Sequence, residues 1–170
     1  MAGGRITLVD ADLRQQELTG FFEASKEAPG LSDKLRDPTS AVPLLGVGPQ
    51  GLALLPAGSG IVAPGAVLAA PGFARLMASL RREGRLMIVS TSSPLGDSDI
   101  AAFSGTVGAA VIVVQAGKTS RRALAATVQR VVAHDIALLG AVLIDVKTKD
   151  LHDAPRSLSR TVEPDVTSNR

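Results

Sequence analysis

The sequence lacks cysteine, tryptophan and tyrosine, and only four of its 170 residues are Phe and two are His. Without cysteine there is no disulfide framework, no thiolate nucleophile and no cysteine metal site. Two histidines are too few for a histidine-rich metal site. Without Tyr or Trp, few side chains can stack on single-stranded nucleic acid. Apolar residues nevertheless make up 45% of the chain, so a core of aliphatic side chains is expected.

Strong charge and long apolar runs are also missing. The net charge is +2, and the basic clusters are small enough to be solvated helix surface, which argues against nucleic acid as a partner. No run of about 18 apolar residues occurs, so no membrane-spanning helix is expected. The acidic residue Asp10 lies within the first ten residues, which is unlike the basic and then apolar start of a signal peptide. The clusters are Arg81, Arg82 and Arg85, and Lys118, Arg121 and Arg122.

Short apolar runs alternate with amphipathic segments along the chain. The runs predict strands, and the 3.6-residue spacing predicts helices between them. This alternation predicts an α/β domain over residues 1–146, with a mostly parallel sheet and helices on both faces. Residues 147–170, rich in charge, Ser, Thr and Pro, are predicted to form a disordered tail. The expected strands are Arg5–Val9, Gly51–Leu55, Leu86–Val89, Val111–Val114 and Leu138–Val146.

The expected helices start at recognisable caps. A helix carries Phe73, Leu76, Met77 and Leu80 on one face and ends near Gly84, and a longer one follows a cap at Thr119 or Ser120. Shorter helical segments are expected within Leu13–Ala24, over Leu31–Arg36, and from a cap at Asp97 or Ser98 through Phe103.

Two glycine motifs resemble phosphate-binding loops but lack the right context. Gly46–Gly51 matches G-x-G-x-x-G, yet it precedes a strand and contains Pro49, which has no N–H to donate. Ala116–Ser120 resembles the end of a Walker A loop, but the required first glycine is Ile112. Both segments are interpreted as ordinary turns, with Lys118 a candidate contact for an anion.

Two carboxylates, Asp10 and Asp12, directly follow the first expected strand. At the carboxyl end of a strand, such a pair is well placed to hold Mg²⁺ or to orient a water near phosphates. An acidic loop that caps a nearby helix explains the same spacing. The sequence leaves both interpretations open.

Several segments, in order, resemble the cytoplasmic kinase domain of bacterial tyrosine kinases (BY-kinases). This family belongs to the MinD/ParA-like branch of P-loop ATPases and regulates capsule and exopolysaccharide chain length. The resemblance implies a P-loop NTPase-like fold. The segments are LVDADLR (Leu8–Arg14), PGLSDKL (Pro29–Leu35), GLALLPAG (Gly51–Gly58), VLAAPGFARLMASLRREG (Val67–Gly84), VIVVQAGKTSRRAL (Val111–Leu124) and LLGAVLIDV (Leu138–Val146).

The chain departs from the family pattern at the nucleotide site. The family's first strand and Walker A loop precede the LVDADLR segment, and this sequence begins after them. The Walker B aspartate is replaced by Ser90, although Asp99 matches a further family aspartate. The asparagine near the adenine is replaced by Ile144, and the tyrosine-rich tail is absent. Asp10 and Asp12 match, and would hold the metal if Mg-ATP binds.

These departures imply a non-catalytic relative that acts by protein–protein interaction in exopolysaccharide or capsule biosynthesis, with no cofactor in isolation. The expected partners are further copies of the chain or a membrane-embedded polysaccharide co-polymerase, which would hold a cytoplasmic protein at the inner membrane. One alternative is a tyrosine kinase or ATPase fragment that uses Mg-ATP and whose P-loop lies upstream or on a partner chain. A second is a relative of the MinD/ParA partition ATPases.

The absent first strand has a structural consequence. In the family it lies inside the sheet, next to the Walker B strand. The Arg5–Val9 and Leu86–Val89 strands must therefore pair directly, recruit another segment or leave edges open, and open edges invite association with another chain.

Overall fold

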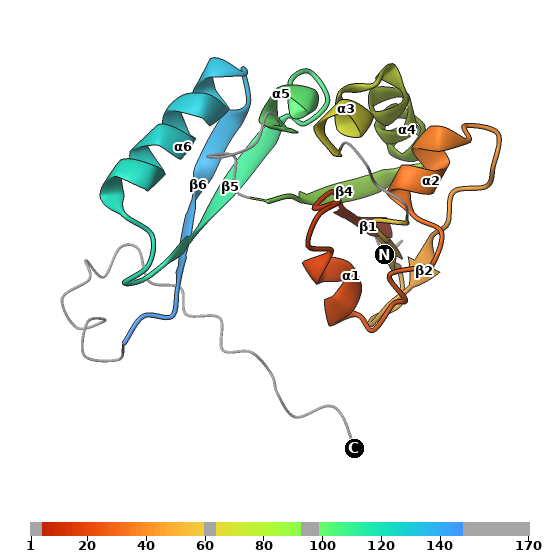
Figure 1. Cartoon of the computed structure of the whole chain (residues 1–170), viewed down its shortest axis with the longest axis horizontal. Helices are drawn as coiled ribbons and strands as arrows, with labels where there is room; N and C mark the ends of the chain where they lie inside the picture. Colours follow the sequence, from red (N-terminus) through yellow and green to blue (C-terminus); the bar gives the residue numbers. More distant parts are fainter. Residues whose placement is uncertain (1–4, 60–63, 93–98, 148–170) are drawn as a thin grey trace.

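Two sheets form the framework of the computed structural model, which describes residues 5–59, 64–92 and 99–147 (Figure 1). The larger sheet has the order β2-β3-β1-β4, in which β1 pairs in parallel with β3 and β4, and β2 pairs antiparallel with β3. The smaller sheet pairs β5 with β6 in parallel. The strands are β1 (Arg5–Asp10), β2 (Leu45–Gly46), β3 (Leu52–Leu55), β4 (Arg85–Ser90), β5 (Ala109–Gln115) and β6 (Ala137–Ile144).

The helices begin and end where local chemistry allows. Pro71 begins α4 at a position where a missing N–H costs nothing, and Gly84, with φ 72°, follows its end. The Ser120 hydroxyl accepts the Ala123 N–H at 3.1 Å and caps α6, whereas Thr119 accepts the Gln115 N–H. Ser120 is therefore the cap. The helices are α1 (Glu17–Phe21), α2 (Leu31–Arg36), α3 (Pro64–Ala69), α4 (Pro71–Arg82), α5 (Asp99–Phe103) and α6 (Arg121–Ala133).

One aliphatic core joins the two sheets. Helices α3, α4, α5 and α6 lie along the same side of both sheets, whereas α1 lies on the other side, below β1 in Figure 1. Phe73 of α4 and Phe103 of α5 meet edge to face, with ring centroids 5.6 Å apart. The partly buried residues packed on this core include Met87 and Val89 of the larger sheet and Ala110 and Leu138 of the smaller one.

The structure confirms the α/β class and the mostly parallel pairing, and it corrects several details. The strand β2 and the helix α3 were not expected, and β6 ends at Ile144 rather than Val146 because Asp145 has a left-handed φ of 57°. Helices do lie on both faces, but α1 covers the second face only near β1. The candidate caps Asp97 and Ser98 and the tail from 148 to 170 lie outside the described residues.

The strands β1 and β4 pair directly along their whole length, from Arg5 beside Arg85 to Asp10 beside Ser90. Within the described part of the chain, β4 and β5 pair with no strand on their other sides, so each is an edge strand. We call the space between them the β4–β5 interval. The structure thus combines two of the expected outcomes, direct pairing and open edges. No helix among the described residues is long and apolar enough to cross a bilayer.

Candidate functional site

The carboxyl ends of β1 and β4 lie side by side. Asp10 and Ser90 are neighbours in the parallel register, and the Ala11 N–H donates to the Ser90 carbonyl at 2.8 Å. Because carboxyl ends of parallel strands meet at one edge of a sheet, ligands in such folds bind there. The structure therefore brings together three of the predicted site residues, Asp10, Asp12 and Ser90.

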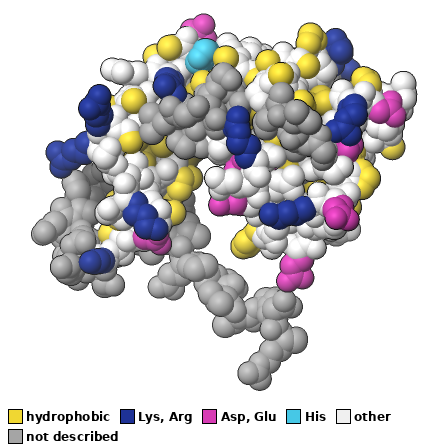
Figure 2. Space-filling model, viewed as in Figure 1, with side chains coloured by type: hydrophobic (Ala, Val, Ile, Leu, Met, Phe, Trp, Pro, Cys, Tyr) yellow, Lys and Arg dark blue, Asp and Glu magenta, His cyan; other side chains and the backbone are white. Residues whose placement is uncertain are grey.

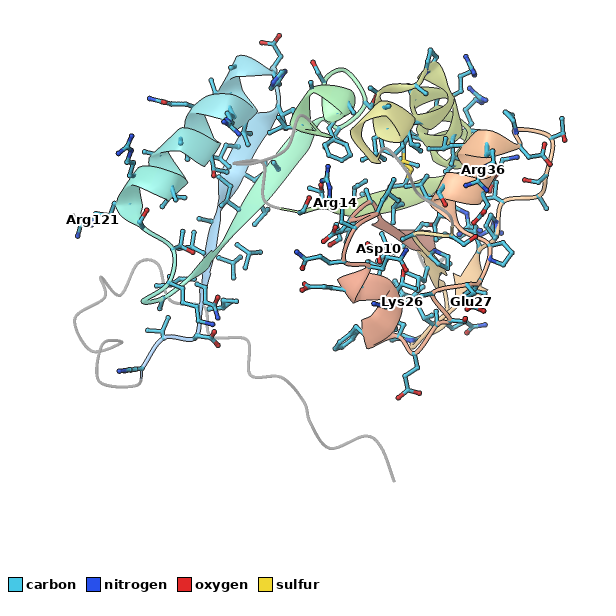
Figure 3. All side chains as sticks on the ribbon, in the orientation of Figure 1. Asp10, Arg14, Lys26, Glu27, Arg36 and Arg121 are labelled. Atoms are coloured by element: carbon cyan, nitrogen blue, oxygen red, sulfur yellow. The ribbon has the colours of Figure 1, made fainter. Side chains whose placement is uncertain are left out.

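The Asp10 carboxylate is fully buried and is occupied by hydrogen bonds within the chain. Its Oδ2 accepts the Thr19 N–H at 2.8 Å and the Thr19 hydroxyl at 2.6 Å, and its Oδ1 accepts the Asp12 N–H at 3.2 Å. The Thr19 hydroxyl oxygen in turn accepts the Ala57 N–H at 3.1 Å. Asp10, between the end of β1 and α1 in Figure 3, thus joins β1, α1 and the segment after β3.

Asp12 shapes the turn that leads into α1. Its Oδ1 accepts the Arg14 N–H at 3.2 Å and the Gln15 N–H at 3.1 Å, and its carbonyl accepts the Gln16 N–H at 2.9 Å. These bonds form a turn before α1 and do not cap the helix, because their donors precede Glu17 and the N-cap position of α1 makes no side-chain cap bond. Across the part of the chain that the structure describes, no group of three His, Cys, Asp or Glu residues could hold a metal ion.

The other predicted site residues lie on the far side of the β4–β5 interval or in α5. Lys118 is exposed in the turn after β5, and Ile144 is partly exposed at the end of β6. The Ala116 N–H donates to the Ile144 carbonyl at 2.9 Å, which joins that turn to the end of β6. Asp99 begins α5, but its side chain lies outside the description. The structure therefore does not bring Lys118 or Ile144 to Asp10.

A backbone junction between α2 and the segment after β3 was not predicted. The first N–H groups of α2 donate to that segment, Leu31 to the Pro56 carbonyl at 2.7 Å and Ser32 to the Ala57 carbonyl at 2.9 Å. A Cβ on Gly30 would lie 2.2 Å from the Gly58 nitrogen, so only glycine fits. The signal was present in the sequence, because the PGLSDKL and GLALLPAG segments each contain one of these glycines.

The Asp33 carboxylate stabilises the same junction through hydrogen bonds. Its Oδ2 accepts the N–H groups of Gly30 at 3.0 Å and Ser59 at 3.1 Å, and its Oδ1 accepts from the Arg36 guanidinium at 3.1 Å. Burial alone would raise the pKa of Asp33, but the hydrogen bonds from Ser59 and Gly30 and the charge of Arg36 outweigh it and lower the pKa. The carboxylate is therefore ionised at neutral pH and fixes the start of α2.

No family model matches the chain, and no curated protein sequence matches it. Solved structures do match. The VpsO kinase domain has a TM-score of 0.76 at 24% identity, covering 84% of this chain and 71% of that one. The kinase domain of Escherichia coli tyrosine kinase ETK has a TM-score of 0.73 at 25% identity, covering 85% of this chain and 58% of that one. A cobyrinic acid a,c-diamide synthase from Mycobacterium smegmatis, with bound ATP analog and magnesium, has a TM-score of 0.58 at 20% identity, covering 83% and 62%.

These likenesses place the chain in the P-loop NTPase-like class of α/β proteins. Within that class, its fold is that of the cytoplasmic kinase domains of bacterial tyrosine kinases, so the resemblance seen in the sequence is confirmed at the level of fold. The chain spans 58% of the ETK kinase domain. The activity and partners of whole kinase domains therefore do not transfer to it directly.

Proposed function

We propose that this chain is a non-catalytic BY-kinase-like domain that acts by protein–protein interaction in exopolysaccharide or capsule biosynthesis or chain-length regulation. The observation that carries the proposal concerns the side chains at the carboxyl ends of β1 and β4. Asp10 is buried and its carboxylate holds α1 and the segment after β3, while its neighbour on β4 is Ser90.

The residues at this edge do not fit Mg-ATP. Mg²⁺ prefers carboxylate, water and phosphate oxygens in an octahedral set, and a neutral hydroxyl at Ser90 is a poor substitute for a carboxylate. Both oxygens of Asp10 already accept hydrogen bonds from the chain. A metal at this position would have to reach a fully buried carboxylate whose Oδ2 already accepts two hydrogen bonds from Thr19.

Protein–protein interaction is supported by the edges of β4 and β5, with which no further strand of the described residues pairs. Such edges present rows of free N–H and C=O groups and readily pair with another chain. Under this proposal the domain is cytoplasmic and meets further copies of itself or a membrane-embedded polysaccharide co-polymerase. The latter contact would place it beside the inner membrane.

The proposal predicts that the isolated 170-residue chain has no functional affinity for nucleotide. In a titration with a fluorescent ATP analogue and Mg²⁺, we expect no saturable binding at micromolar concentrations, because the residues present hold neither phosphate nor metal. The ETK kinase domain serves as the positive control. Micromolar binding that is lost on chelating Mg²⁺ would contradict the proposal.

The second candidate function is an ATP-dependent tyrosine kinase or ATPase whose P-loop comes from another segment or a partner chain. It is favoured by one observation, that Asp10 and Asp12 lie at the carboxyl end of β1, which β4 alone separates from the β4–β5 interval among the described strands. In this case Mg²⁺-dependent nucleotide binding would appear only after that interval is filled.

A further inference from the structure

The strand β6 presents a sheet edge that lacks the usual protection against pairing. Among the described strands it pairs only with β5, so its other flank is free of strands there. Edge strands are usually kept from pairing by charged residues, proline or very short length. β6 is eight residues long, and its sequence ALLGAVLI contains no charged residue and no proline. Lys and Arg side chains lie over this half of the molecule (Figure 2), but none belongs to β6.

The second half of β6 has the regular backbone that a partner strand needs. A bulge in the pairing with β5 lies before Gly140, and from Gly140 to Ile144 the register advances one residue at a time. The Ala116 N–H donates to the Ile144 carbonyl at 2.9 Å, so the backbone groups of Ile144 face β5. Because successive residues of a strand direct these groups to opposite flanks, those of Ala141 and Leu143 face the free edge.

The side chains of this run suit a copy of the same strand. Val142 is 49% exposed, and its register partner Val113 lies on the side of the sheet away from the core. Leu143 and Ala141 lie on the other side, and Leu143 is 56% exposed. In an antiparallel pair centred on Val142, Leu143 of each copy lies opposite Ala141 of the other. A large side chain then meets a small one on one side, and two valines meet on the other.

The charges that flank β6 are complementary in the same arrangement. Asp135 precedes the strand, Lys147 follows it, and both are exposed. Asp145 also follows the strand, but it accepts from the Gln115 side chain at 2.6 Å. Antiparallel pairing brings the start of each strand beside the end of the other, so Asp135 of each copy lies near Lys147 of the other. A parallel copy would bring like charges together, and the flanking charges therefore favour the antiparallel one.

We propose that two copies of this chain associate through β6, edge to edge and antiparallel, about a two-fold axis beside Val142. Ala141 of each copy exchanges both backbone hydrogen bonds with Leu143 of the other. The contact is self-complementary, so it closes at two copies. It produces a continuous sheet in the order β5-β6-β6-β5, with both α6 helices on one side. This inference rests on the proposed function and names the surface through which the chain meets a further copy.

Two other occupants of the edge fit less well. Residues 148–170 follow β6 in the sequence, but they are rich in charge, contain Pro155 and Pro164, and hold no apolar run comparable with Gly140–Ile144. A strand of an unrelated protein could form the backbone bonds, but it would not by itself match the opposite charges at the two ends of β6. The second copy satisfies the backbone, the side chains and the charges together.

The first test places a single cysteine in the full chain, which has none of its own. In the proposed pair Val142 faces itself in a non-hydrogen-bonded position, where Cα atoms are about 4.5 Å apart. A disulfide joins Cα atoms about 4.4–6.8 Å apart. Val142→Cys should therefore give a disulfide-linked dimer under mild oxidation, seen on a non-reducing gel. Val113→Cys is the control, because Val113 is 63% exposed on the same side but would lie about 14 Å from its copy.

The second test measures association of the unlinked chain by light scattering over a range of concentrations. We expect a reversible dimer. Val142→Lys should weaken it at least about tenfold, because two like charges would lie directly opposite one another. Ala141→Pro should also weaken it, since proline removes an N–H that faces the edge and leaves the pairing with β5 in place. Ile88→Lys is the control, because Ile88 is 51% exposed on β4, and it should leave the dimer unchanged.

Several results would overturn the inference. They are a chain that stays monomeric at all concentrations, a dimer that Val142→Lys leaves intact or Ile88→Lys weakens equally, and cross-linking by Val113→Cys in place of Val142→Cys. A monomer whose Ala141 and Leu143 amides resist hydrogen exchange would also overturn it, because the chain would then cover its own edge. The nucleotide titration does not involve β6. Nucleotide binding would therefore contradict the proposed function without removing the dimer, and a missing dimer would leave the nucleotide prediction standing.

Discussion

Replacing Asp10 with alanine should lower the free energy of unfolding by about 3 kcal/mol. The carboxylate is fully buried and accepts three hydrogen bonds, two from Thr19 and one from the Asp12 N–H. Its loss leaves these donors without an acceptor in a place that water does not reach. Because a domain of this size is stable by about 5–15 kcal/mol, the effect is a large part of the total. Urea denaturation followed by circular dichroism measures it.

A matched pair of isosteric variants separates burial from charge. Asp145 also follows the carboxyl end of a strand, but it is exposed and accepts from the Gln115 side chain at 2.6 Å. Asp145→Asn should change stability by less than about 0.5 kcal/mol, whereas Asp10→Asn should remain clearly destabilising. A gain in stability with Asp10→Asn would instead mark a carboxylate kept under strain for a ligand, and would contradict the structural role assigned to it.

Replacing Gly30 with alanine should also cost about 3 kcal/mol. The added Cβ would lie 2.2 Å from the Gly58 nitrogen and 2.4 Å from the Pro56 carbonyl oxygen. Both are backbone atoms that cannot rotate away, and the nearby bonds from Leu31 and Ser32 would be pushed apart. The fall in the thermal unfolding midpoint of the variant reports this cost.

Gly20 provides the control for the general effect of replacing glycine. It lies in α1, and nothing is within 4 Å of the position of its Cβ. Gly20→Ala should therefore raise stability by about 0.5–1 kcal/mol, since alanine has the better helix propensity. If Gly30→Ala and Gly20→Ala shifted the midpoint in the same direction, the close packing of α2 on the segment after β3 would be wrong.

Much of the fold could be predicted because local patterns suffice for it. The continuous apolar run before Asp10 and the helical spacing of Phe73, Leu76 and Met77 each match the element observed. The two-residue strand β2 and the helix α3 were missed. β2 exists through its pairing with β3, and α3 begins at a proline in a stretch that the sequence pattern treats as broken. The strand β2 therefore depends on tertiary pairing, and the helix α3 depends on the preference for proline in the first turn of a helix.

The position of the candidate site could be predicted from the sequence, but the hydrogen-bond partner of the Asp10 carboxylate could not. The spacing of Asp10 and Asp12 after a strand placed both at the carboxyl edge, and the register adds Ser90 beside them. The partner of Asp10 is Thr19, nine residues away, on a short helix whose position no sequence pattern specifies. Direct pairing of β1 with β4 and open strand edges were two of the three expected outcomes, whereas the separation of the strands into two sheets was not predicted, because strand order depends on contacts between distant segments.

The most direct test of an open β4–β5 interval is native-state hydrogen exchange on the 170-residue chain alone, read residue by residue by NMR. β1 lies between β3 and β4, so its amides should be protected throughout. In β4, only the alternate amides that donate to β1 should be protected, and the others should exchange as fast as exposed amides. Uniform protection along both edges of β4 in the monomeric chain would show that the edge is already paired, and would contradict the account.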